Sequence, residues 1–489
     1  MLVDQVVLAA SAMESGVTAG NSAWMLISAS LVLLMTPAVA FFYGGMSRQK
    51  STLNMMMMSF GALGAIGVIY VLWGYSMSYS SGDIGGIFAN PFTNFGLRGI
   101  LPSDDGTFPT GSNGYPEIID VAFQLTFAVI TVALISGSLA NRVKFSTWLV
   151  FSVLWVTFAF FPLAHMVWGG GLLSDSEHSI AAWLFGTTMD DGEKVAKIAP
   201  IDFAGGTVVH INAGVAGLVL ALIVGKSRDF LKVPQRPHNL PLTMIGTTFL
   251  WFGWFGFNAG SAFAADGSAA LAWVNTTVAA CTAMMAWLAV ERIRDGHATS
   301  LGAASGVVAG LVAITPACGN LTPVTSIILG AVAGVVSAYG VGLKYKLKFD
   351  DSLDVVGVHL LSGIWGTVGV GLLAKDHAGL FTGGGADGFR LFIIQVVIAV
   401  VAMVFTAIIT TIIGTILSAA MGWRIDDSAE RGGIDFAMHS ETAYDFVGMD
   451  IRDGHSIGVV DPANGVRCMG TRNRFNPELQ RDRAGIRRR

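Results

Sequence analysis

The feature that most constrains this chain is a series of uncharged, mainly apolar runs of 20 residues or more, separated by short charged clusters. A run of that length allows an α-helix to cross the roughly 30 Å of hydrocarbon in a bilayer. Only 13% of the 489 residues are charged, whereas a soluble globular protein has about 25%. We therefore expect an all-α, multi-pass protein of the lipid bilayer.

The uncharged runs predict eleven transmembrane helices. The eighth and ninth share one run of 46 residues, Ala298 to Leu343, which is too long for a single helix. Its segment TPACGNLTP, Thr315 to Pro323, contains the turn-forming residues that divide it. The predicted spans lie near residues 22–44, 54–78, 121–141, 145–166, 202–225, 239–263, 268–290, 298–315, 323–343, 355–374 and 391–420.

The distribution of Lys and Arg predicts that the N-terminus lies outside the cell and the C-terminus inside. In this orientation the inner loops contain thirteen of these residues and the outer loops five. Positively charged loops mark the cytoplasmic side of a membrane protein. No Lys or Arg precedes the short apolar stretch VVLAASA near the N-terminus, so a cleaved signal peptide is not expected.

The predicted organisation of the chain has four parts. Residues 1–20 form an outer N-terminal segment, and residues 21–422 form the transmembrane domain. Residues 423–446 mix charged with apolar and aromatic positions and form a cytoplasmic tail. Residues 447–489 are rich in Gly and Arg, and we expect this extension to be disordered. No stretch has the size and periodicity of an attached enzymatic or signalling domain.

Two short segments repeat each other. VVHINAG, Val208 to Gly214, and GVHLLSG, Gly357 to Gly363, share the pattern V-H-x-x-x-G, and their histidines are 149 residues apart. The first lies in the fifth span, which runs inward, and the second lies in the tenth span, which runs outward. This placement predicts two five-helix halves related by an inverted repeat, followed by a final helix. Such repeats place a substrate site near the middle of the membrane.

Three of the nine histidines, His165, His210 and His359, lie at or within spans. A single histidine there is more often a core imidazole that hydrogen-bonds a neighbouring helix. Two at matched positions of a repeat favour a functional role, because polar groups are costly inside a membrane. Adjacent imidazoles cannot both be protonated cheaply, and a neutral imidazole offers one donor and one acceptor. A pair can therefore bind a small hydrogen-bonding solute and pass a proton along.

A metal site is not expected at these histidines. No Cys or acidic cluster accompanies them, although metal sites usually combine such ligands with imidazoles. The three cysteines also lack the spacing of a metal site or of a disulfide framework.

Several longer segments carry a family resemblance. They are FYGGMSRQKSTLNMMMM, AHMVWGGGLL, DFAGGTVVHINAGVAGLVLALIVGK, PHNLP, WFGWFGFNAGS and DVVGVHLLSGIWGTVGVG. Together they resemble the ammonium transporter family of bacteria, fungi and plants, from about residue 20 to residue 446. HMVWGGG and GTVVHINAG match this family rather than the related Rhesus-type proteins.

The resemblance implies the fold and assembly of that family. It implies eleven helices, an outer N-terminus, an inner C-terminus and a five-plus-five inverted repeat. It also implies a homotrimer in the cell membrane with one pore per subunit. On the same ground we expect no enzymatic activity, no cofactor, no metal and no nucleic-acid partner.

The resemblance assigns pore roles to four residues. His210 and His359 match the twin-histidine pair in the middle of the pore. Phe127 and Phe257 match the two stacked rings that close the pore on its outer side. Without the resemblance, aromatic residues at helical spacing are more often packing residues.

Three further residues match the outer entrance. Trp168 and Ser261 match, together with Phe127, the vestibule that first receives the cation. Asp202 matches the acidic residue at the head of the fifth span. An Asp that opens a helix is by default an N-cap, so Asp202 is expected to be partly structural while its charge favours a nearby cation.

The cytoplasmic tail has its own likeness in the segment GIDFAMHSETAY. In the family this segment packs under neighbouring subunits and, in bacteria, supports docking of a trimeric PII-type signal protein. The matching positions are Gly433, Asp435, His439, Glu441 and Tyr444.

We therefore expect a transporter of ammonium, with methylammonium as a further candidate substrate. Ammonium and potassium are similar in size and charge, but only ammonium can give up a proton and continue through an apolar pore as ammonia. Two alternatives stay open, an ammonium sensor that signals through a partner protein and a neutral ammonia channel. Whether the proton follows the ammonia also stays open.

Overall fold

The structure is a computed structural model of the whole chain. It describes the backbone of residues 2–233, 235–444, 460–461 and 465–466, and the side chains of residues 16–233 and 235–444. The predicted extension 447–489 therefore lies outside the described residues, apart from two short strands. By its contacts the chain separates into one unit up to Glu441 and a second from Thr442 onward, and the fold described below is that of the first unit.

Within the described residues, ten helical segments are long and apolar enough to cross a membrane, and an eleventh, shorter apolar helix has 15 residues. All eleven coincide with the predicted spans, which confirms the all-α, multi-pass fold class. In chain order they are Gly16–Met46, Gln49–Tyr79, Ile118–Leu139, Phe145–Trp168, Gly206–Val224, Leu240–Gly260, Gly267–Arg294, the shorter Ser300–Ile314, Pro323–Leu347, Val356–Leu373 and Gly385–Ala420.

These spans are built from fourteen α-helices. They are α1 (Leu2–Met46), α2 (Thr52–Ile69), α3 (Tyr75–Tyr79), α4 (Ile118–Ile135), α5 (Phe145–Trp155), α6 (Phe161–Trp168), α8 (Asn212–Val224), α9 (Leu240–Gly260), α10 (Gly267–Arg294), α11 (Ser300–Ile314), α12 (Pro323–Gly340), α13 (Leu343–Leu347), α14 (Leu361–Leu373) and α15 (Gly385–Ala420).

The connections and the tail add short elements. The short helices are α7 (Ile180–Phe185), α16 (Asp427–Gly432) and α17 (Ile434–His439). Three antiparallel hairpins pair β1 (Asp83–Ile84) with β2 (Phe88–Ala89), β3 (Thr187–Asp190) with β4 (Glu193–Ala196), and β5 (Val460–Asp461) with β6 (Gly465–Val466).

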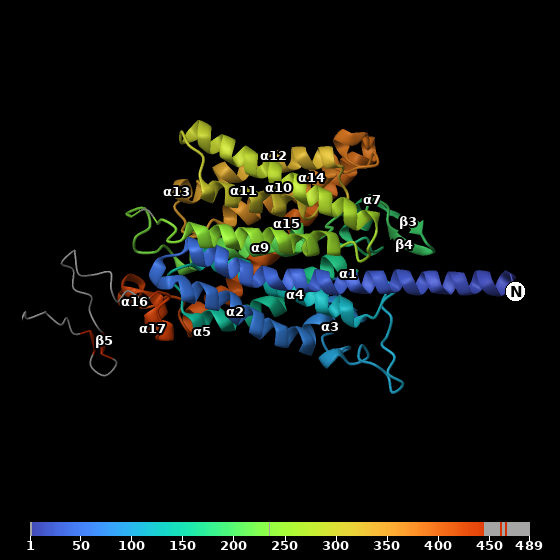
Figure 1. Cartoon of the computed structure of the whole chain (residues 1–489), viewed down its shortest axis with the longest axis horizontal. Coiled ribbons are helices and arrows are strands. Elements are labelled where there is room, and N and C mark those ends of the chain that lie inside the picture. Colours follow the sequence, from blue (N-terminus) through green and yellow to red (C-terminus); the bar gives the residue numbers. More distant parts are fainter. Residues whose placement is uncertain (1, 234, 445–459, 462–464, 467–489) are drawn as a thin grey trace, which may run out of the picture. The chain divides into compact units, whose positions relative to one another are not determined.

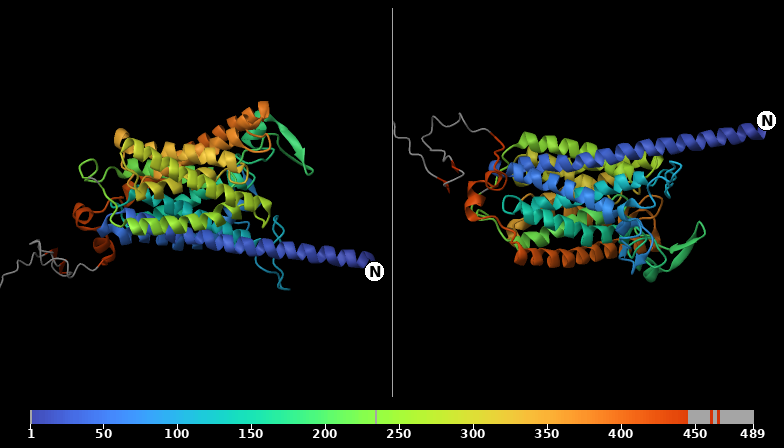
Figure 2. Two further views of the ribbon diagram at one scale, coloured as in Figure 1. Left: turned by 45° about the horizontal axis from the view of Figure 1, so that its top comes forward. Right: turned by 90° about the horizontal axis from the view of Figure 1, so that it is seen from below.

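The membrane helices lie side by side, with the β3–β4 hairpin at one end of the bundle and α16 and α17 at the other (Figures 1 and 2). We call the end with the connections 80–117 and 169–205 the loop face. The end that carries α16 and α17 is the tail face.

The first helix is longer than the sequence predicts. The first span is expected to begin near residue 22, but α1 is continuous from Leu2 to Met46. Residues 2–15 are mostly Ala, Val, Leu, Met and other residues that a helix tolerates, without Gly or Pro. The chain therefore has no local signal that would end the helix at the membrane boundary.

Helix α1 packs closely along α9, which begins the second half of the repeat (Figure 1). Gly253, Gly256 and Gly260 lie on the contact face of α9, where a Cβ atom would collide with atoms of Leu31, Met35 or Ser28 on α1. Small residues allow two membrane helices to approach in this way, with van der Waals contact replacing the hydrophobic effect that water would supply.

The fifth and tenth spans meet through matched contacts. A Cβ atom at Gly214 would lie 2.6 Å from Cβ of Leu360, and one at Gly363 would lie 3.2 Å from the backbone N of Ile211. Gly363 and Leu360 each lie 149 residues after Gly214 and Ile211 respectively. Gly214 therefore contacts Leu360, and its equivalent Gly363 contacts Ile211, which is the equivalent of Leu360. A two-fold relation between the two segments requires this reciprocal contact.

Both spans also begin with a π-helical turn. The turns cover Gly206–Ile211 and Val356–Leu360 and contain the two repeated histidines. Single π-helical turns within α-helices occur frequently at functional sites. The π-helical turns therefore determine the direction in which the side chains of His210 and His359 point.

Candidate functional site

A large cavity opens on the loop face of the bundle. Its volume is about 830 Å³, and its lining includes Phe127, Trp168, Asp202 and Ser261. We call it the outer cavity. All four residues that the sequence predicts at the entrance therefore line the same cavity.

Two aromatic rings close the inner end of this cavity. The ring centroids of Phe127 and Phe257 are 4.3 Å apart, at an interplanar angle of 32°. Phe127 lines the outer cavity, whereas Phe257 lines a second, smaller cavity. The edge of the Trp168 ring also meets Phe127, with centroids 6.1 Å apart at 88°. The stacked pair thus separates the two cavities.

The second cavity, the inner cavity, is small and apolar. Its volume is about 10 Å³, which is close to the minimum that one water molecule needs. Four of its lining residues have polar rings: His210, His359, Tyr43 and Trp254. The hydroxyl of Tyr43 donates to the backbone O of Leu134, and Nε1 of Trp254 donates to the hydroxyl of Thr315. The other lining residues are Met35, Val39, Phe42, Ile130, Leu134, Leu250, Phe257 and Val308.

The two histidines contact each other directly. Their Nδ1 atoms are 3.4 Å apart, and the rings are nearly parallel at 20°. Only 1% of His210 and 3% of His359 is exposed. Trp254 stacks on His210 at a centroid distance of 5.5 Å and holds the ring in place. Nε2 of His210 is buried and has no hydrogen-bond partner within the described structure.

The contact between the Nδ1 atoms restricts the protons of the pair. One Nδ1 must carry the hydrogen and the other must accept it, so in the neutral pair one ring has a free acceptor at Nε2 and the other has N–H at Nε2. The pair can therefore accept a proton at one end and release one at the other.

Asp202 acts as the N-terminal cap of the fifth span. Its Oδ1 accepts hydrogen bonds from the backbone N–H groups of Gly205 and Gly206, at 3.0 and 2.6 Å. Its Oδ2 accepts those of Thr207 and Val208, at 2.9 and 3.2 Å. Burial raises the pKa of Asp202, and these four hydrogen bonds act in the opposite direction. A carboxylate offers about four acceptor positions, so little capacity is left for a cation.

Trp168 is tied to the same turn. Its Nε1 donates to the backbone O of Asp202 at 2.9 Å. The hydroxyl of Ser261 donates to the backbone O of Phe257 at 2.8 Å. The Trp168 ring is thus held by the backbone at the head of the fifth span, and the Ser261 hydroxyl is held by the backbone at the end of the sixth.

Asp351 is the counterpart of Asp202, and the sequence analysis missed it. It precedes His359 by eight residues, as Asp202 precedes His210. Its carboxylate accepts from the N–H groups of Val355 and Val356, at 3.1 and 2.7 Å. Burial raises its pKa to about 6. The common offset from the histidine was the available signal, because the repeat continues from the histidine back to the carboxylate.

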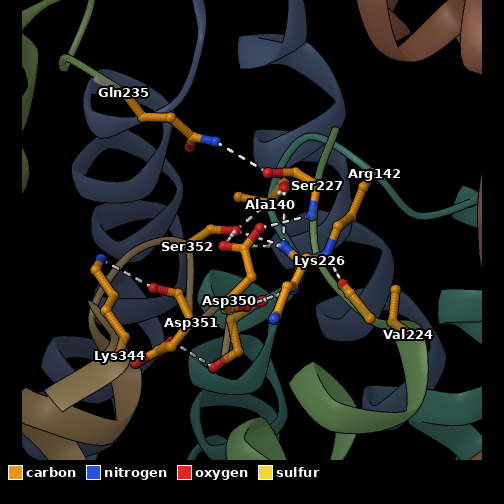
Figure 3. Close-up of polar contacts among 12 residues, drawn as sticks. Ala140, Arg142, Val224, Lys226, Ser227, Gln235, Lys344, Asp350, Asp351 and Ser352 are labelled. Atoms are coloured by element: carbon orange, nitrogen blue, oxygen red, sulfur yellow. Dashed lines mark hydrogen bonds and ion pairs between the residues drawn. The ribbon is translucent and has the colours of Figure 1, made fainter. Parts of the chain in front are cut away.

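Arg142 forms a second polar centre on the tail face that the sequence did not indicate (Figure 3). It is fully buried and donates to the backbone O atoms of Ser138 and Asp350, at 2.8 and 2.6 Å, and to Gly225 O at 3.1 Å. Burial acts to raise the pKa of Asp350, but the charge of Arg142 and hydrogen bonds from Ser227 outweigh it and the pKa is lowered. Arg142 thus joins the third, fifth and tenth spans where they leave the membrane.

His165 lies on the loop face and not in either cavity lining. Its Nε2 is 2.8 Å from Oδ1 of Asp83, and its Nδ1 is 3.1 Å from the backbone O of Ser78. These contacts attach the β1–β2 hairpin to the helix that carries Trp168. They give His165 a structural role.

The predicted tail residues contact the start of the second span. Oδ2 and Oδ1 of Asp435 accept from the N–H groups of Leu53 and Asn54, at 3.1 and 2.8 Å, and so cap α2. Nε2 of His439 is 3.0 Å from Oδ1 of Asn54. Gly433 has a φ of 119° and lies against Lys50.

The remaining tail positions are Glu441 and Tyr444. Glu441 is exposed and Tyr444 is partly buried. The tail residues at positions 445 and 446 lie outside the described residues.

Among the described side chains, no group of three or more His, Cys, Asp or Glu residues is arranged to hold a metal ion.

In the part of the chain that the structure describes, eleven apolar helices, an entrance cavity, a stacked aromatic closure and a buried polar pair behind it define a multi-pass membrane protein of the transporter class. Comparisons with known proteins identify the family. The model of the Ammonium Transporter Family matches residues 23–444. The ammonium transporter of Mycobacterium tuberculosis is 49% identical over 452 residues, which cover 87% of this chain and 90% of that protein.

Solved structures agree with this result. Mep2 of Saccharomyces cerevisiae has a TM-score of 0.71 at 29% identity, covering 83% of this chain and 90% of that one. A structure described as a Sensor Amt Protein has a TM-score of 0.74 at 23% identity, covering 87% of this chain and all of that one, and shares the fold. The chain belongs to the ammonium transporter family.

Proposed function

We propose that this protein carries ammonium across the cell membrane from the loop face to the tail face. The observation that carries the proposal is the pair His210–His359, two contacting imidazoles in a small apolar cavity directly behind the Phe127–Phe257 rings. Membership of the ammonium transporter family supports ammonium as the substrate.

The outer cavity receives the cation in this proposal. The rings of Trp168 and Phe127 offer their faces to ammonium, and a cation–π contact contributes about 2 kcal/mol or more when the cation is desolvated. The Ser261 hydroxyl adds an oxygen at the same end of the cavity. We assign recruitment to these three residues, and we assign backbone positioning to Asp202 because its carboxylate is occupied by four N–H groups.

Selectivity arises at the aromatic closure. Beyond Phe127 and Phe257, a dry apolar passage penalises a full charge by between about 3 and 10 kcal/mol. Ammonium avoids this cost by transferring a proton and entering as ammonia, whereas potassium has no proton to transfer. The histidine pair supplies the acceptor, because one of its Nε2 atoms is free of hydrogen in the neutral pair.

The orientation and assembly follow from the same reasoning. The excess of Lys and Arg in the tail-face loops supports an inner tail face and an outer loop face. We propose a homotrimer with one pore in each subunit, and a PII-type signal protein as partner of the tail residues 423–446. Both proposals rest on the family relation and on the tail motif.

The decisive experiment uses the purified full-length protein in liposomes. Ammonium addition should give either an inward current or a change of internal pH, and potassium addition should give neither. A current identifies electrogenic transport, and internal alkalinisation without current identifies neutral ammonia conduction. The absence of both responses would contradict the proposal and favour a sensor.

A further inference from the structure

The outer cavity is strongly acidic. Glu117, Asp120, Asp175 and Asp202 line it, and its lining contains no Lys or Arg. Asp202 is occupied by backbone N–H groups, and Asp175 is exposed at the rim. Glu117 and Asp120 are the two remaining carboxylates of the lining, and they have no part in the mechanism above.

These two carboxylates retain free acceptor capacity. Tyr75 donates its hydroxyl to Oε1 of Glu117 at 2.7 Å. Tyr115 donates to Oδ1 of Asp120 at 2.6 Å, and Asn113 donates to its Oδ2 at 3.1 Å. The tyrosine and asparagine partners are neutral, and within the described part of the chain neither carboxylate has an ion pair with Lys, Arg or His. Two partly buried negative charges thus lack a positive partner.

A third oxygen in the same cavity lacks any partner. Gln124 lines the outer cavity, only 8% of it is exposed, and its Oε1 is buried without a hydrogen-bond donor within the described structure. A buried amide oxygen without a donor is costly, at about 1–3 kcal/mol. A cation with N–H groups would satisfy this oxygen.

The three residues form one row that leads to the aromatic closure. Positions 117, 120, 124 and 127 are spaced by three or four residues and therefore lie on one face at the start of α4. With a rise of about 1.5 Å per residue, Glu117 lies about 15 Å and Gln124 about 5 Å before Phe127 along the helix. The row begins at the loop face and ends at the Phe127 ring.

We propose that Glu117, Asp120 and Gln124 form an outer site for small monovalent cations, which concentrates ammonium ahead of the Trp168–Phe127 vestibule. This inference rests on the proposed transport of ammonium. The site acts through charge and oxygen ligands, so it attracts potassium as well. The outer site therefore determines how readily a cation is captured, whereas the histidine pair determines the preference for ammonium over potassium.

The first test measures initial transport rates against ammonium chloride concentration in proteoliposomes, for Asp120→Asn and Glu117→Gln. Both variants keep an oxygen for the tyrosine hydroxyl and remove the charge. At about 10 mM ionic strength, where the Debye length is about 30 Å, we expect the half-saturating concentration to rise about five- to tenfold with the maximal rate unchanged. At about 1 M salt, where the Debye length is about 3 Å, the difference should shrink below about twofold. The preference for ammonium over potassium should not change.

Asp191→Asn is the matched control. Asp191 is exposed next to β3 on the same face, outside the cavity lining, so its loss changes the net charge equally. It should behave as the wild type. Wild-type half-saturation in both cavity variants, or the same shift in the control, would overturn the outer site.

A second test does not depend on transport. Crystals soaked in caesium chloride should give an anomalous peak beside the carboxylate of Asp120 and Oε1 of Gln124, and Asp120→Asn should remove it. A peak in a protein that does not transport ammonium would overturn the proposed function and leave the site. Transport with neither a peak nor a shift of half-saturation would overturn the site and leave the function.

Discussion

At the scale of single residues, the hydrogen-bond partners of each polar atom distinguish residues that support the backbone from residues that can bind a substrate. Asp202 is occupied by four backbone N–H groups, so its position at the head of the fifth span serves the backbone. Nε2 of His210, by contrast, is buried without a partner in the described structure. A buried polar atom that the fold leaves unpaired is the stronger indication of contact with a substrate.

Alanine substitution of His210 or His359 tests the pair. Either change removes a proton acceptor and opens space that water can enter, so potassium no longer meets the full desolvation penalty. We expect ammonium transport to fall about tenfold and the preference over potassium to fall by a similar factor, as a loss of about 1.4 kcal/mol would produce. The double variant should resemble the single ones, because contacting residues act as a unit. Ammonium and potassium fluxes in proteoliposomes measure both effects.

Unchanged selectivity in all three variants would mean that the histidines are structural. Thermal unfolding and gel filtration of the same variants control for folding and assembly.

At the scale of elements, the contact between the fifth and tenth spans depends on two glycines that are unequally tolerant. At Gly214 a Cβ atom would meet the backbone of Leu360 at 2.7 Å, whereas at Gly363 its nearest contacts with His210 and Ile211 are 3.2 Å. Backbone atoms cannot move aside without shifting the helix that carries His359. The two repeats are thus alike in sequence and differ in how closely they pack.

Gly214→Ala should therefore destabilise the protein more than Gly363→Ala. We expect a loss of about 1–3 kcal/mol for Gly214→Ala, the usual cost of overpacking, and a clearly smaller loss for Gly363→Ala. Gly64→Ala is the control, because a Cβ atom at Gly64 meets nothing within 4 Å. Thermal unfolding in detergent ranks the three variants, and equal losses at Gly214 and Gly64 would contradict the close contact.

The tail is the second element whose role can be tested. Asp435 caps α2, and Glu430 accepts from Arg424 and from the backbone N–H of Arg228. These contacts hold the membrane ends of three spans together on the tail face.

Deletion of residues 447–489 should leave transport near that of the wild type, whereas deletion from Arg424 onward should impair it. The longer deletion removes the cap of α2, which alone contributes about 0.5–2 kcal/mol. Asp435→Ala should reproduce part of the loss. Transport assays in cells, normalised to the amount of protein in the membrane, measure the effect, and equal activity of the two truncated proteins would refute this division of the tail.

At the scale of the whole molecule, the odd number of described spans places the two ends of the membrane domain on opposite sides of the bilayer. The loop face carries the acidic outer cavity, and the tail face carries most of the Lys and Arg residues of the loops. One of these cations, Arg142, is fully buried by hydrogen bonds to the backbone and does not face the inner solution. Without Arg142, the tail-face loops still contain more Lys and Arg residues than the loop-face connections.

Cysteine labelling tests the orientation. In a background in which Cys468 is replaced by Ser, Asp191→Cys on the loop face should react with a membrane-impermeant maleimide in intact cells. Lys232→Cys, which is exposed between the fifth and sixth spans, should react only after the membrane is permeabilised. The reverse pattern would invert the proposed direction of transport.

Much of this molecule follows from the sequence alone. The spans, the fold class and the repeat follow from uncharged runs and from V-H-x-x-x-G, because the bilayer imposes a minimum length on each helix and excludes charge from it. The resemblance also supplied Phe127, Phe257, Trp168 and Ser261, which the structure brings to the two cavities. The early start of α1 was missed, because the first span is predicted only from near residue 22, whereas residues 2–15 contain no Gly or Pro to interrupt a helix.

Only the tertiary structure decided what each polar atom has for a partner. The sequence does not single out Glu117, Asp120 and Gln124 at the start of the third span, and it counts Arg142 as an ordinary loop cation. Their meaning depends on which atoms of distant segments lie beside them: a charged partner for Asp350, neutral hydroxyls for Glu117 and Asp120, and none for Oε1 of Gln124. Hydropathy and spacing constrain segments one at a time, whereas the satisfaction of a buried hydrogen-bonding group is a property of the segments that meet around it.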